Sequence, residues 1–221
     1  MEPSIIVVYA KAILKLKLGN GFISLSQQEV LSILDSCIIM SAKRQHAEVN
    51  RNLKQLVVYI VLRTIGGAII TYFRSKSGGE TRLLGKKSIG FGGHVEVVDT
   101  GEAVNTLAST TLVVDMIDKA VERELKEELG LVLPKSIYPT TIIGLLNDNL
   151  TAVGKVHLGI VILKTISSDI MKNVVVDSSI NNVKVIPVQD ILQEDLTLTS
   201  KYEDWSRYLL LDSTFLKLLG T

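Results

Sequence analysis

The chain has 221 residues, which is long enough to bury a hydrophobic core without disulfides or a structural metal. Its 24 Lys and Arg residues nearly balance its 23 Asp and Glu residues, and the net charge of +1 argues against non-specific binding to duplex nucleic acid or to an anionic membrane. The single cysteine, Cys37, excludes an intrachain disulfide and any zinc site built from several cysteines.

The N-terminal segment does not have the pattern of a signal peptide. It lacks a basic start, and Lys11, Lys15 and Lys17 interrupt its apolar stretch. No segment of the chain approaches the roughly 20 apolar residues that a membrane-spanning helix needs. We therefore expect a cytoplasmic protein that is not inserted in a membrane.

The first part of the chain is predicted to form strands around one helix. Residues 5–16 and 55–63 are rich in β-branched and aromatic residues, which is typical of strands. Between them a helix is expected, with Ser26 as its N-cap. Gly66 and Gly67 separate the second strand from a further apolar run at the spacing of a β-hairpin.

The second part of the chain contains one long predicted helix among further strands. The pattern is helical from about residue 114 to residue 129, and Gly130 is well placed to end the helix. Strands are predicted at residues 140–148, 155–166 and 181–188, followed by a helix at about residues 203–219. Strands before and after a helix predict an α/β or α+β fold, with a mixed sheet flanked by helices.

Three glutamates of the long helix form the main candidate site. Glu124, Glu127 and Glu128 are spaced i, i+3 and i+4, so their side chains converge on one patch. Each of these charges opposes the negative end of the helix dipole, at a cost of about 0.3–1 kcal/mol. A bound cation would reverse this penalty, and Mg²⁺ or Mn²⁺ prefers carboxylate oxygens and bridges to phosphate. The alternative is a solvated acidic face, which explains Glu122 and Lys126 well but the cluster poorly.

Arg123 lies next to this cluster in the sequence. It stands four residues before Glu127 and can fix a carboxylate through its planar guanidinium group. An ordinary surface ion pair explains the same spacing, so the residue alone does not distinguish the two interpretations.

The segment from Arg123 to Leu131 resembles the end of the signature of the Nudix hydrolases. That signature reads Arg-Glu-aliphatic-any-Glu-Glu-any-Gly-aliphatic, and this segment agrees with it at every specified position. The resemblance implies a Nudix α/β/α sandwich in which Glu124, Glu127 and Glu128 bind the metal ions. It also implies that Arg123 orients these glutamates, and that the carbonyl of Gly92, in a glycine-rich segment, is an additional metal ligand.

The first half of the signature is not matched at the usual spacing. Glu102 lies too far from Arg123, whereas Asp115 stands at the expected distance, so the choice between Glu102 and Asp115 stays open. The wider sequence is similar to a bacterial and phage subgroup of predicted phosphoesterases over about residues 50–210. Residues 1–50 are accordingly expected to be an accessory extension, and residues 51–221 the Nudix domain.

Basic residues around the glycine-rich segment are candidates for substrate binding. Arg74, Arg82 and Lys86 could neutralise the phosphates of a substrate, although exposed basic residues in turns are common. The histidines His46, His94 and His157 provide no convincing metal-ligand set in the sequence. Glu203 is a weaker candidate for a late acidic group near the active site.

The resemblance implies a hydrolase that uses Mg²⁺ or Mn²⁺ to cleave a phosphoanhydride bond in a nucleoside-diphosphate-linked or other nucleotide-like substrate. One alternative is a Nudix-fold domain that binds a nucleotide for regulation without turnover. Another is an assembly protein that associates through its apolar N-terminal strands. The expected partner is a small nucleotide-like molecule, neither duplex nucleic acid nor a membrane. The oligomeric state stays open, with a homodimer as one alternative.

Overall fold

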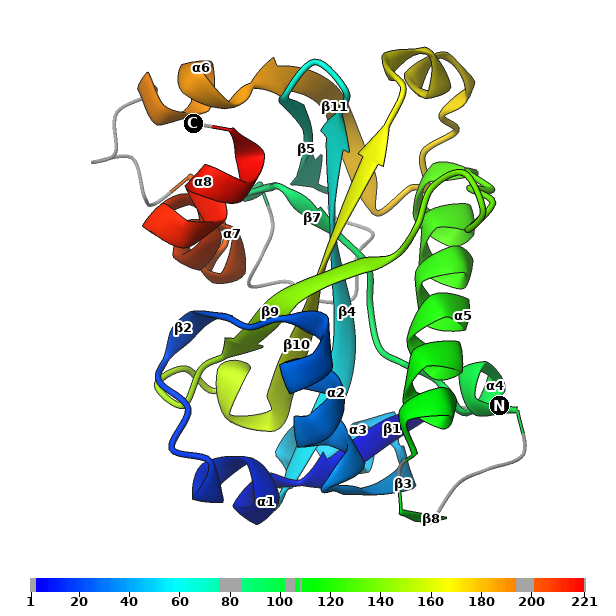
Figure 1. Ribbon diagram of the computed structural model, residues 1–221, viewed down its shortest axis with the longest axis vertical. Helices are drawn as coiled ribbons and strands as arrows, with labels where there is room; N and C mark the ends of the chain where they lie inside the picture. Colours follow the sequence, from blue (N-terminus) through cyan, green and yellow to red (C-terminus); the bar gives the residue numbers. More distant parts are fainter. Residues whose placement is uncertain (1–2, 76–84, 102–105, 108, 194–200, 221) are drawn as a thin grey trace. The chain divides into compact units, whose positions relative to one another are not determined.

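The computed structural model of the protein describes residues 3–75, 85–101, 106–107, 109–193 and 201–220 (Figure 1). Its contacts divide the chain into two compact units. The first unit consists of Met1–Tyr59, Gly92–Glu122 and Thr141–Ile162. The second unit consists of Ile60–Phe91, Arg123–Thr140 and Leu163–Thr221.

The first unit is built around a sheet. Its strands are β1 (Ser4–Tyr9), β2 (Gly21–Ser24), β3 (Ile38–Lys43), β8 (Thr106–Leu107) and β9 (Thr141–Asn147), together with parts of β4 (Leu53–Thr64) and β10 (His157–Ile166). They follow the order β2-β9-β10-β4-β1-β3-β8. The pairs β1–β3, β1–β4, β2–β9 and β3–β8 are antiparallel. The predicted strands at 55–63, 140–148 and 155–166 are therefore confirmed.

Short helices connect the strands of the first unit. They are α1 (Ala10–Lys15), α2 (Gln27–Asp35), α3 (Arg44–Val49), α4 (Val97–Thr100) and the 3₁₀ helix η2 (Gly154–Val156), and the long helix α5 (Thr110–Leu129) begins in this unit. Ser26 caps α2 as predicted: its hydroxyl accepts from the amide of Glu29, and the Glu29 carboxylate accepts from the amide of Ser26. This reciprocal capping box fixes the start of the helix.

The prediction of one strand over residues 5–16 is wrong, because β1 ends at Tyr9 and α1 follows at once. Residues 5–8 are buried on both faces, as in a central strand. Ala10 and Ile13 are also buried, and their spacing of three residues puts them on one face of a helix. The apolar run therefore contains two periodicities, of which only the first is that of a strand.

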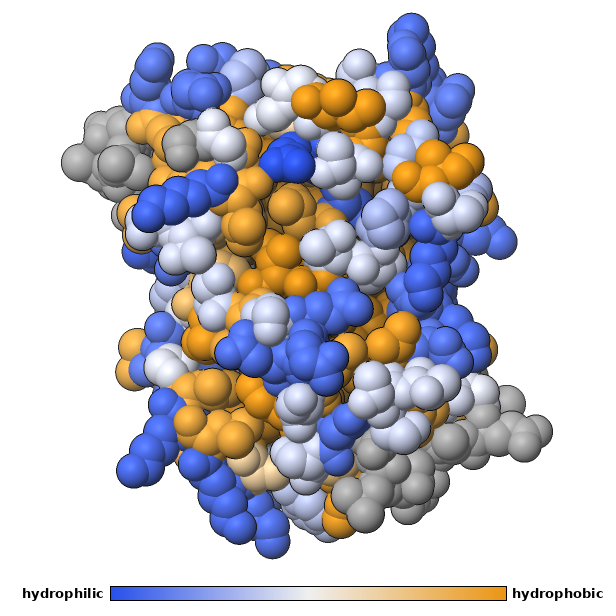
Figure 2. Space-filling model, in the orientation of Figure 1, coloured by the Kyte–Doolittle hydropathy of each residue, from blue (hydrophilic) through white to orange (hydrophobic). Residues whose placement is uncertain are grey.

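The apolar side chains of β1 are buried inside the first unit. Ile5, Ile6, Val7 and Val8 are each at most 1% exposed, and β1 pairs with β3 on one side and β4 on the other. Hydrophobic side chains do reach the surface elsewhere, interspersed with hydrophilic residues on the face shown in Figure 2. Strand β1 thus gives no support to assembly through an apolar N-terminal strand.

The second unit contains the strands β5 (Ala68–Arg74), β6 (Lys87–Ser88), β7 (Gly90–Phe91) and β11 (Ile180–Pro187), with the remaining parts of β4 and β10. Strand β5 pairs antiparallel with β11, β6 and the end of β4, and β7 pairs with β4. The predicted hairpin is confirmed, since β4 and β5 are joined through Gly66 and Gly67. Gly67 has a φ of +82°, a conformation that favours glycine.

The helices of the second unit are η3 (Ser168–Asn173), α6 (Val188–Gln193), α7 (Asp204–Leu210) and α8 (Ser213–Leu219), in addition to the end of α5. The prediction of a single helix over residues 203–219 is wrong, because the helix is interrupted between Leu210, the end of α7, and Ser213, the start of α8. The carboxylate of Asp212 accepts hydrogen bonds from the amides of Thr214 and Phe215, both at 2.9 Å. An aspartate in this position starts a new helix instead of continuing the preceding one.

The predicted fold class, α/β with a large mixed sheet and helices, is confirmed. Among the described residues, no helix is both long and apolar enough to cross a membrane. The division at residue 50 stays a prediction. Residues on its two sides are paired in the first unit, where Val7 lies opposite Gln55 in the β1–β4 ladder.

Candidate functional site

Helix α5 carries the candidate carboxylates on its last two turns. Its buried residues recur at helical spacing, and the segment that belongs to the second unit buries Leu125 and Leu129, which are 1% and 0% exposed. Glu124, one residue before Leu125, is itself only 7% exposed. Glu127 is exposed and Glu128 is half-buried. The cluster therefore lies along the border between the buried stripe and the solvent-exposed face.

Helix α5 ends at Leu129 and is followed by Gly130, as the sequence predicts. Gly130 has a φ of +63°, its amide donates to the carbonyl of Lys126 at 3.0 Å, and the amide of Leu131 donates to Leu125 at 3.1 Å. A left-handed residue in this position turns the chain out of the helix and satisfies its last carbonyls. The role of Gly130 as the helix stop is confirmed.

A distant segment supplies two further caps to the same helix end. The amide of Val175 donates to the carbonyl of Leu129, and the amide of Asp177 donates to the carbonyl of Glu128, both at 3.0 Å. Gly130 lies against this segment, since a Cβ atom added to it would be 3.2 Å from the Cβ of Val175. The backbone that carries Glu128 is consequently held from outside the helix as well as from within it.

Arg123 connects two of the three glutamates. Its Nη1 atom donates to Oε1 of Glu124 at 2.8 Å and to Oε2 of Glu127 at 3.2 Å. The side chain of Arg123 is 17% exposed and that of Glu124 10%, whereas that of Glu127 is 58% exposed. The guanidinium charge offsets repulsion between the two carboxylates and restricts their rotamers. Glu127 remains accessible to a ligand from solvent.

The charge of Glu128 acts on a buried tyrosine of the second unit. Burial raises the pKa of Tyr72 well above its ordinary value; the negative charges of Glu128 and Glu203 raise it further, and the positive charge of Arg74 lowers it. The Tyr72 hydroxyl donates to the carbonyl of Gly90 at 2.8 Å. Tyr72 is therefore neutral at physiological pH and is held by the glycine-rich segment.

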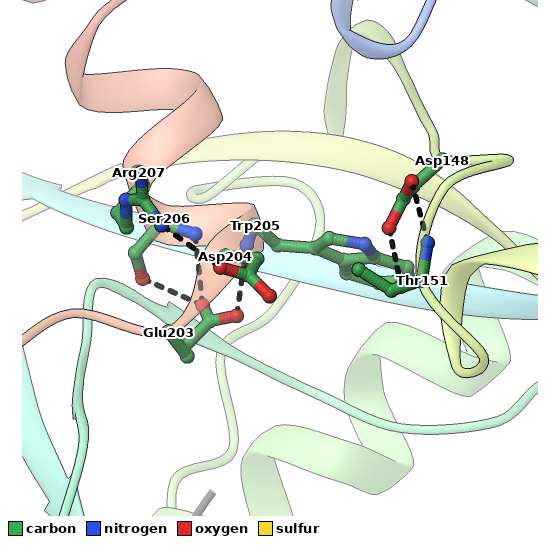
Figure 3. Close-up of polar contacts among 7 residues, drawn as sticks. All are labelled: Asp148, Thr151, Glu203, Asp204, Trp205, Ser206 and Arg207. Atoms are coloured by element: carbon green, nitrogen blue, oxygen red, sulfur yellow. Dashed lines mark hydrogen bonds and ion pairs between the residues drawn. The ribbon is translucent and has the colours of Figure 1, made fainter. Parts of the chain in front are cut away.

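Glu203 caps a helix. Its carboxylate accepts hydrogen bonds from the amides of Trp205 and Ser206 at 3.0 and 2.9 Å, and from the Ser206 hydroxyl at 2.6 Å (Figure 3). Ser88 donates to it from β6 at 3.3 Å. These contacts make Glu203 the N-cap of α7, which accounts for its burial without a catalytic role.

The basic residues predicted to bind substrate are only partly described. Arg74 and Lys86 are neighbours in the second unit, because the Arg74 amide donates to the Lys86 carbonyl at 3.1 Å. The guanidinium of Arg74 lies 5.7 Å from the centre of the Tyr72 ring. Arg82 lies outside the described residues. Contact of these residues with phosphate stays a prediction.

Gly92 and the two upstream acidic candidates belong to other parts of the chain. Gly92 lies in the first unit with a φ of +129°, and a Cβ atom on it would be 2.1 Å from the carbonyl oxygen of Val58 in β4. This close approach explains the glycine. Asp115 is an exposed residue of α5 in the first unit, and Glu102 lies outside the described residues.

Sequence reasoning missed one cluster in the first unit. Nε2 of His94 lies 3.1 Å from Nε2 of His157, and Glu48 lies beside them. Nothing in the sequence pairs two histidines so far apart. Their ligand atoms come together only through the fold, whereas the glutamate helix is visible as a local motif.

Comparison with known proteins supports the fold. No protein-family model matches the chain. It is 29% identical over 167 residues to Protein YmaB of Bacillus subtilis (strain 168), which covers 76% of this chain and 74% of YmaB. Among solved structures it is similar to Tm1382, a candidate Nudix hydrolase, with a TM-score of 0.68 and 23% identity over 98% of each chain.

A second solved structure has the same fold at a lower similarity. A mutT/nudix family protein from Listeria innocua has a TM-score of 0.50 and 15% identity, over 76% of this chain and 98% of that one. The phosphoesterase subgroup suggested by the sequence is not tested by these similarities and stays a prediction. The resemblance first noted in residues 123–131 thus extends to the architecture, and the chain has the fold of the Nudix hydrolases.

Proposed function

We propose that the protein is a metal-dependent hydrolase that cleaves a phosphoanhydride bond in a nucleotide-like substrate. The observation that carries this proposal is the contact of Arg123 with both Glu124 and Glu127 at the end of α5. A solvated acidic face needs no such arginine between a buried and an exposed carboxylate. In a chain with the Nudix fold, the same residues match the end of the family signature.

The donor atoms of the cluster suit a hard divalent cation. Glu124, Glu127 and Glu128 would hold Mg²⁺ or Mn²⁺ through carboxylate oxygens, which these ions prefer. The fit is also electrostatic, because the carboxylates stand at the negative end of a helix dipole. When bound, the metal lowers the pKa of a coordinated water and neutralises charge on the phosphoryl oxygens.

The residues of the chain would orient the ligands and the substrate. Arg123 holds Glu124 and Glu127 in fixed rotamers, and the caps from Gly130, Val175 and Asp177 fix the backbone beneath them. Such support reduces the reorganisation that the site needs when charge develops on the substrate. Arg74, Arg82 and Lys86 are proposed to contact the phosphates of the substrate, for which their positive charge is suited.

The proposal is tested with purified protein, Mg²⁺ or Mn²⁺, and a panel of nucleoside triphosphates, nucleotide sugars, dinucleoside polyphosphates and ADP-ribose. Release of phosphate or pyrophosphate is measured for the native chain and for the variant Glu127→Gln/Glu128→Gln. Glu122→Gln is the matched control, since Glu122 is an exposed glutamate of the same helix outside the cluster. We expect metal-dependent turnover that the double variant loses and the control retains.

Two results would contradict the proposal. A folded double variant with full activity would exclude the cluster from the chemistry. Binding of metal and nucleotide by the native chain without turnover of any compound in the panel would favour the alternative, a nucleotide-binding or regulatory domain.

A further inference from the structure

Three side chains from separate elements of the first unit bring metal-ligating atoms together. Glu48 lies in α3, His94 follows the glycine-rich segment, and His157 begins β10. One ligand atom of each lies within 4.8 Å of the others. We infer from this cluster that the protein has a binding site for a transition metal ion of the zinc class, different in ligand chemistry from the glutamate helix.

The distance between the two histidines is close to that in a zinc site. Bonds of about 2.0–2.1 Å in tetrahedral geometry place two nitrogen ligands about 3.3–3.4 Å apart. Nε2 of His94 and Nε2 of His157 are 3.1 Å apart, so a small movement of either ring accommodates an ion. Oε1 of Glu48 lies 3.9 Å from Nε2 of His157, and a rotamer change brings it closer. The side chain of Glu48 is 31% exposed, which leaves room for this change.

The ring of His157 is already oriented as a metal ligand. Its Nδ1 atom lies 2.7 Å from the carbonyl oxygen of Val153. Because a carbonyl only accepts hydrogen bonds, Nδ1 carries a proton, so whenever the ring of His157 is neutral its lone pair lies on Nε2. A hydrogen bond from the second ring nitrogen to a backbone carbonyl is the usual contact that orients metal-binding histidines.

The tautomer of His157 determines which ring donates in the hydrogen bond between His157 and His94. With His157 in this neutral form its Nε2 accepts, and Nε2 of His94 donates the proton in the hydrogen bond between them. A metal ion takes the place of this shared proton, which moves to Nδ1 of His94, so that the ring stays neutral and offers Nε2 as a ligand. The contact between the two rings is therefore compatible with a site for one ion.

The loop before His157 is rigidly held. The ammonium group of Lys54 donates to the carbonyls of Gly154 at 2.8 Å and of His157 at 3.2 Å. Asp148 accepts from the amide and the hydroxyl of Thr151, as Figure 3 shows. A Cβ atom on Gly154 would lie 2.3 Å from the Asp148 carboxylate, so this packing requires glycine. Fixed backbone around a ligand reduces the ordering that metal binding requires.

The donor set selects the metal. Two imidazoles and one carboxylate suit Zn²⁺, and also Co²⁺ or Ni²⁺, whereas Mg²⁺ prefers oxygen ligands and retains its water. Three protein ligands leave one position of a tetrahedral ion for water or for a bound group. The rival account is a structural histidine pair beside a surface ion pair, since Oε1 of Glu48 also lies 3.6 Å from Nε of Arg44.

The test is a titration of the chelator-treated chain of 221 residues with Zn²⁺ by calorimetry and with Co²⁺ by visible absorption. The variants are His94→Gln and Glu48→Gln, and the matched control is His46→Gln. His46 lies on the same helix as Glu48, is exposed, and contacts Asn50 at 3.4 Å outside the cluster. Thermal unfolding of each variant verifies that the fold is retained.

We expect the native chain to bind one equivalent of Zn²⁺ in the presence of excess Mg²⁺, and to give the intense Co²⁺ spectrum of tetrahedral coordination. His94→Gln and Glu48→Gln should weaken Zn²⁺ binding roughly tenfold or more, whereas His46→Gln should not change it. Glu127→Gln/Glu128→Gln should also retain the site, which separates this proposal from the hydrolase proposal. The inference is overturned if the native chain binds no stoichiometric Zn²⁺, or if folded His94→Gln binds it as tightly as His46→Gln.

Discussion

The ammonium group of Lys54 donates a hydrogen bond to the backbone carbonyl of His157 at 3.2 Å, within the first unit. The same group also contacts four further oxygens, which belong to Asn147, Asp148, Asn149 and Gly154. Lys54 is 1% exposed, and burial lowers its pKa to about 8, while the charge of Asp148 acts in the opposite direction. One buried cation thus fastens β4 to the loop that precedes β10.

Replacement of Lys54 by methionine should destabilise the protein strongly. The substitution keeps an unbranched side chain but removes the donor for five buried or half-buried oxygens, and each unsatisfied buried polar group costs about 1–3 kcal/mol. Allowing for some entry of water, we expect a loss of at least about 3 kcal/mol in the free energy of unfolding, measured by urea denaturation. Lys15→Met, at an exposed lysine of α1, should change the free energy by less than about 0.5 kcal/mol. Equal effects of the two substitutions would contradict this role of Lys54.

The lowered pKa of Lys54 also predicts a pH dependence of stability. The folded pKa is about 8 and the ordinary value is 10.5, so between these values the unfolded chain binds more protons than the folded chain. The free energy of unfolding contributed by this group therefore increases as the pH rises through about 8. Above about pH 10 the raised pKa of Tyr72 acts in the opposite direction, because only the unfolded chain loses that proton.

The measurement is the difference in unfolding free energy between the native chain and Lys54→Met, from about pH 7 to about pH 9.5. This difference should widen with pH, since only the native chain has the group. Two parallel curves would show that the pKa of Lys54 is not lowered in the folded protein.

Replacement of Arg123 by lysine should impair the proposed hydrolase while the fold is retained. Lysine keeps the positive charge but lacks the planar group whose Nη1 atom reaches both Glu124 and Glu127. Loss of a group that orients metal ligands typically costs 10–100-fold, so we expect kcat/KM to fall by about that factor and more metal to be needed for half-maximal activity. Lys126→Arg, at an exposed position of the same helix, is the control. Unchanged metal dependence in Arg123→Lys would show that the arginine does not orient the ligands.

Replacement of Gly130 by alanine should destabilise the end of α5. The φ of +63° strains an alanine, and its Cβ atom would lie 3.2 Å from the Val175 side chain and 3.3 Å from the Val175 carbonyl oxygen. We expect a loss of about 1–2 kcal/mol in the free energy of unfolding, measured by urea denaturation. Gly19→Ala should have almost no effect, because nothing lies within 4 Å of the added atom and φ is not positive. A neutral Gly130→Ala would mean that the segment at Val175 moves away freely.

The parts of the site that could be predicted are those encoded locally. The spacing of Glu124, Glu127 and Glu128 determines which helix face they share, and Gly130 marks a helix end wherever the helix packs. The arginine contacts follow from the same short-range geometry. The substrate is not encoded in this way, because specificity depends on side chains brought together from other parts of the fold.

The parts that could not be predicted depend on long-range packing. Neither His94 nor His157 has a local pattern that indicates the other, and Lys54 gives no sign that its five acceptors come from one distant loop. The two wrong elements have a different cause. Each prediction assigns a single element to an apolar run that contains two. Residues 5–16 include the end of a strand and a helix, and residues 203–219 include two helices, the second of which starts at the N-cap Asp212.

The caps on Glu128 and Leu129 have a consequence for protein synthesis. Their carbonyls receive hydrogen bonds from the amides of Val175 and Asp177, which leave the ribosome long after the helix itself. A nascent chain that ends before residue 175 therefore carries the three glutamates on a helix whose last carbonyls lack these partners. Helix ends of this kind fray. The carboxylate cluster is thus expected to reach its final geometry only once η3 and the segment after it have been made.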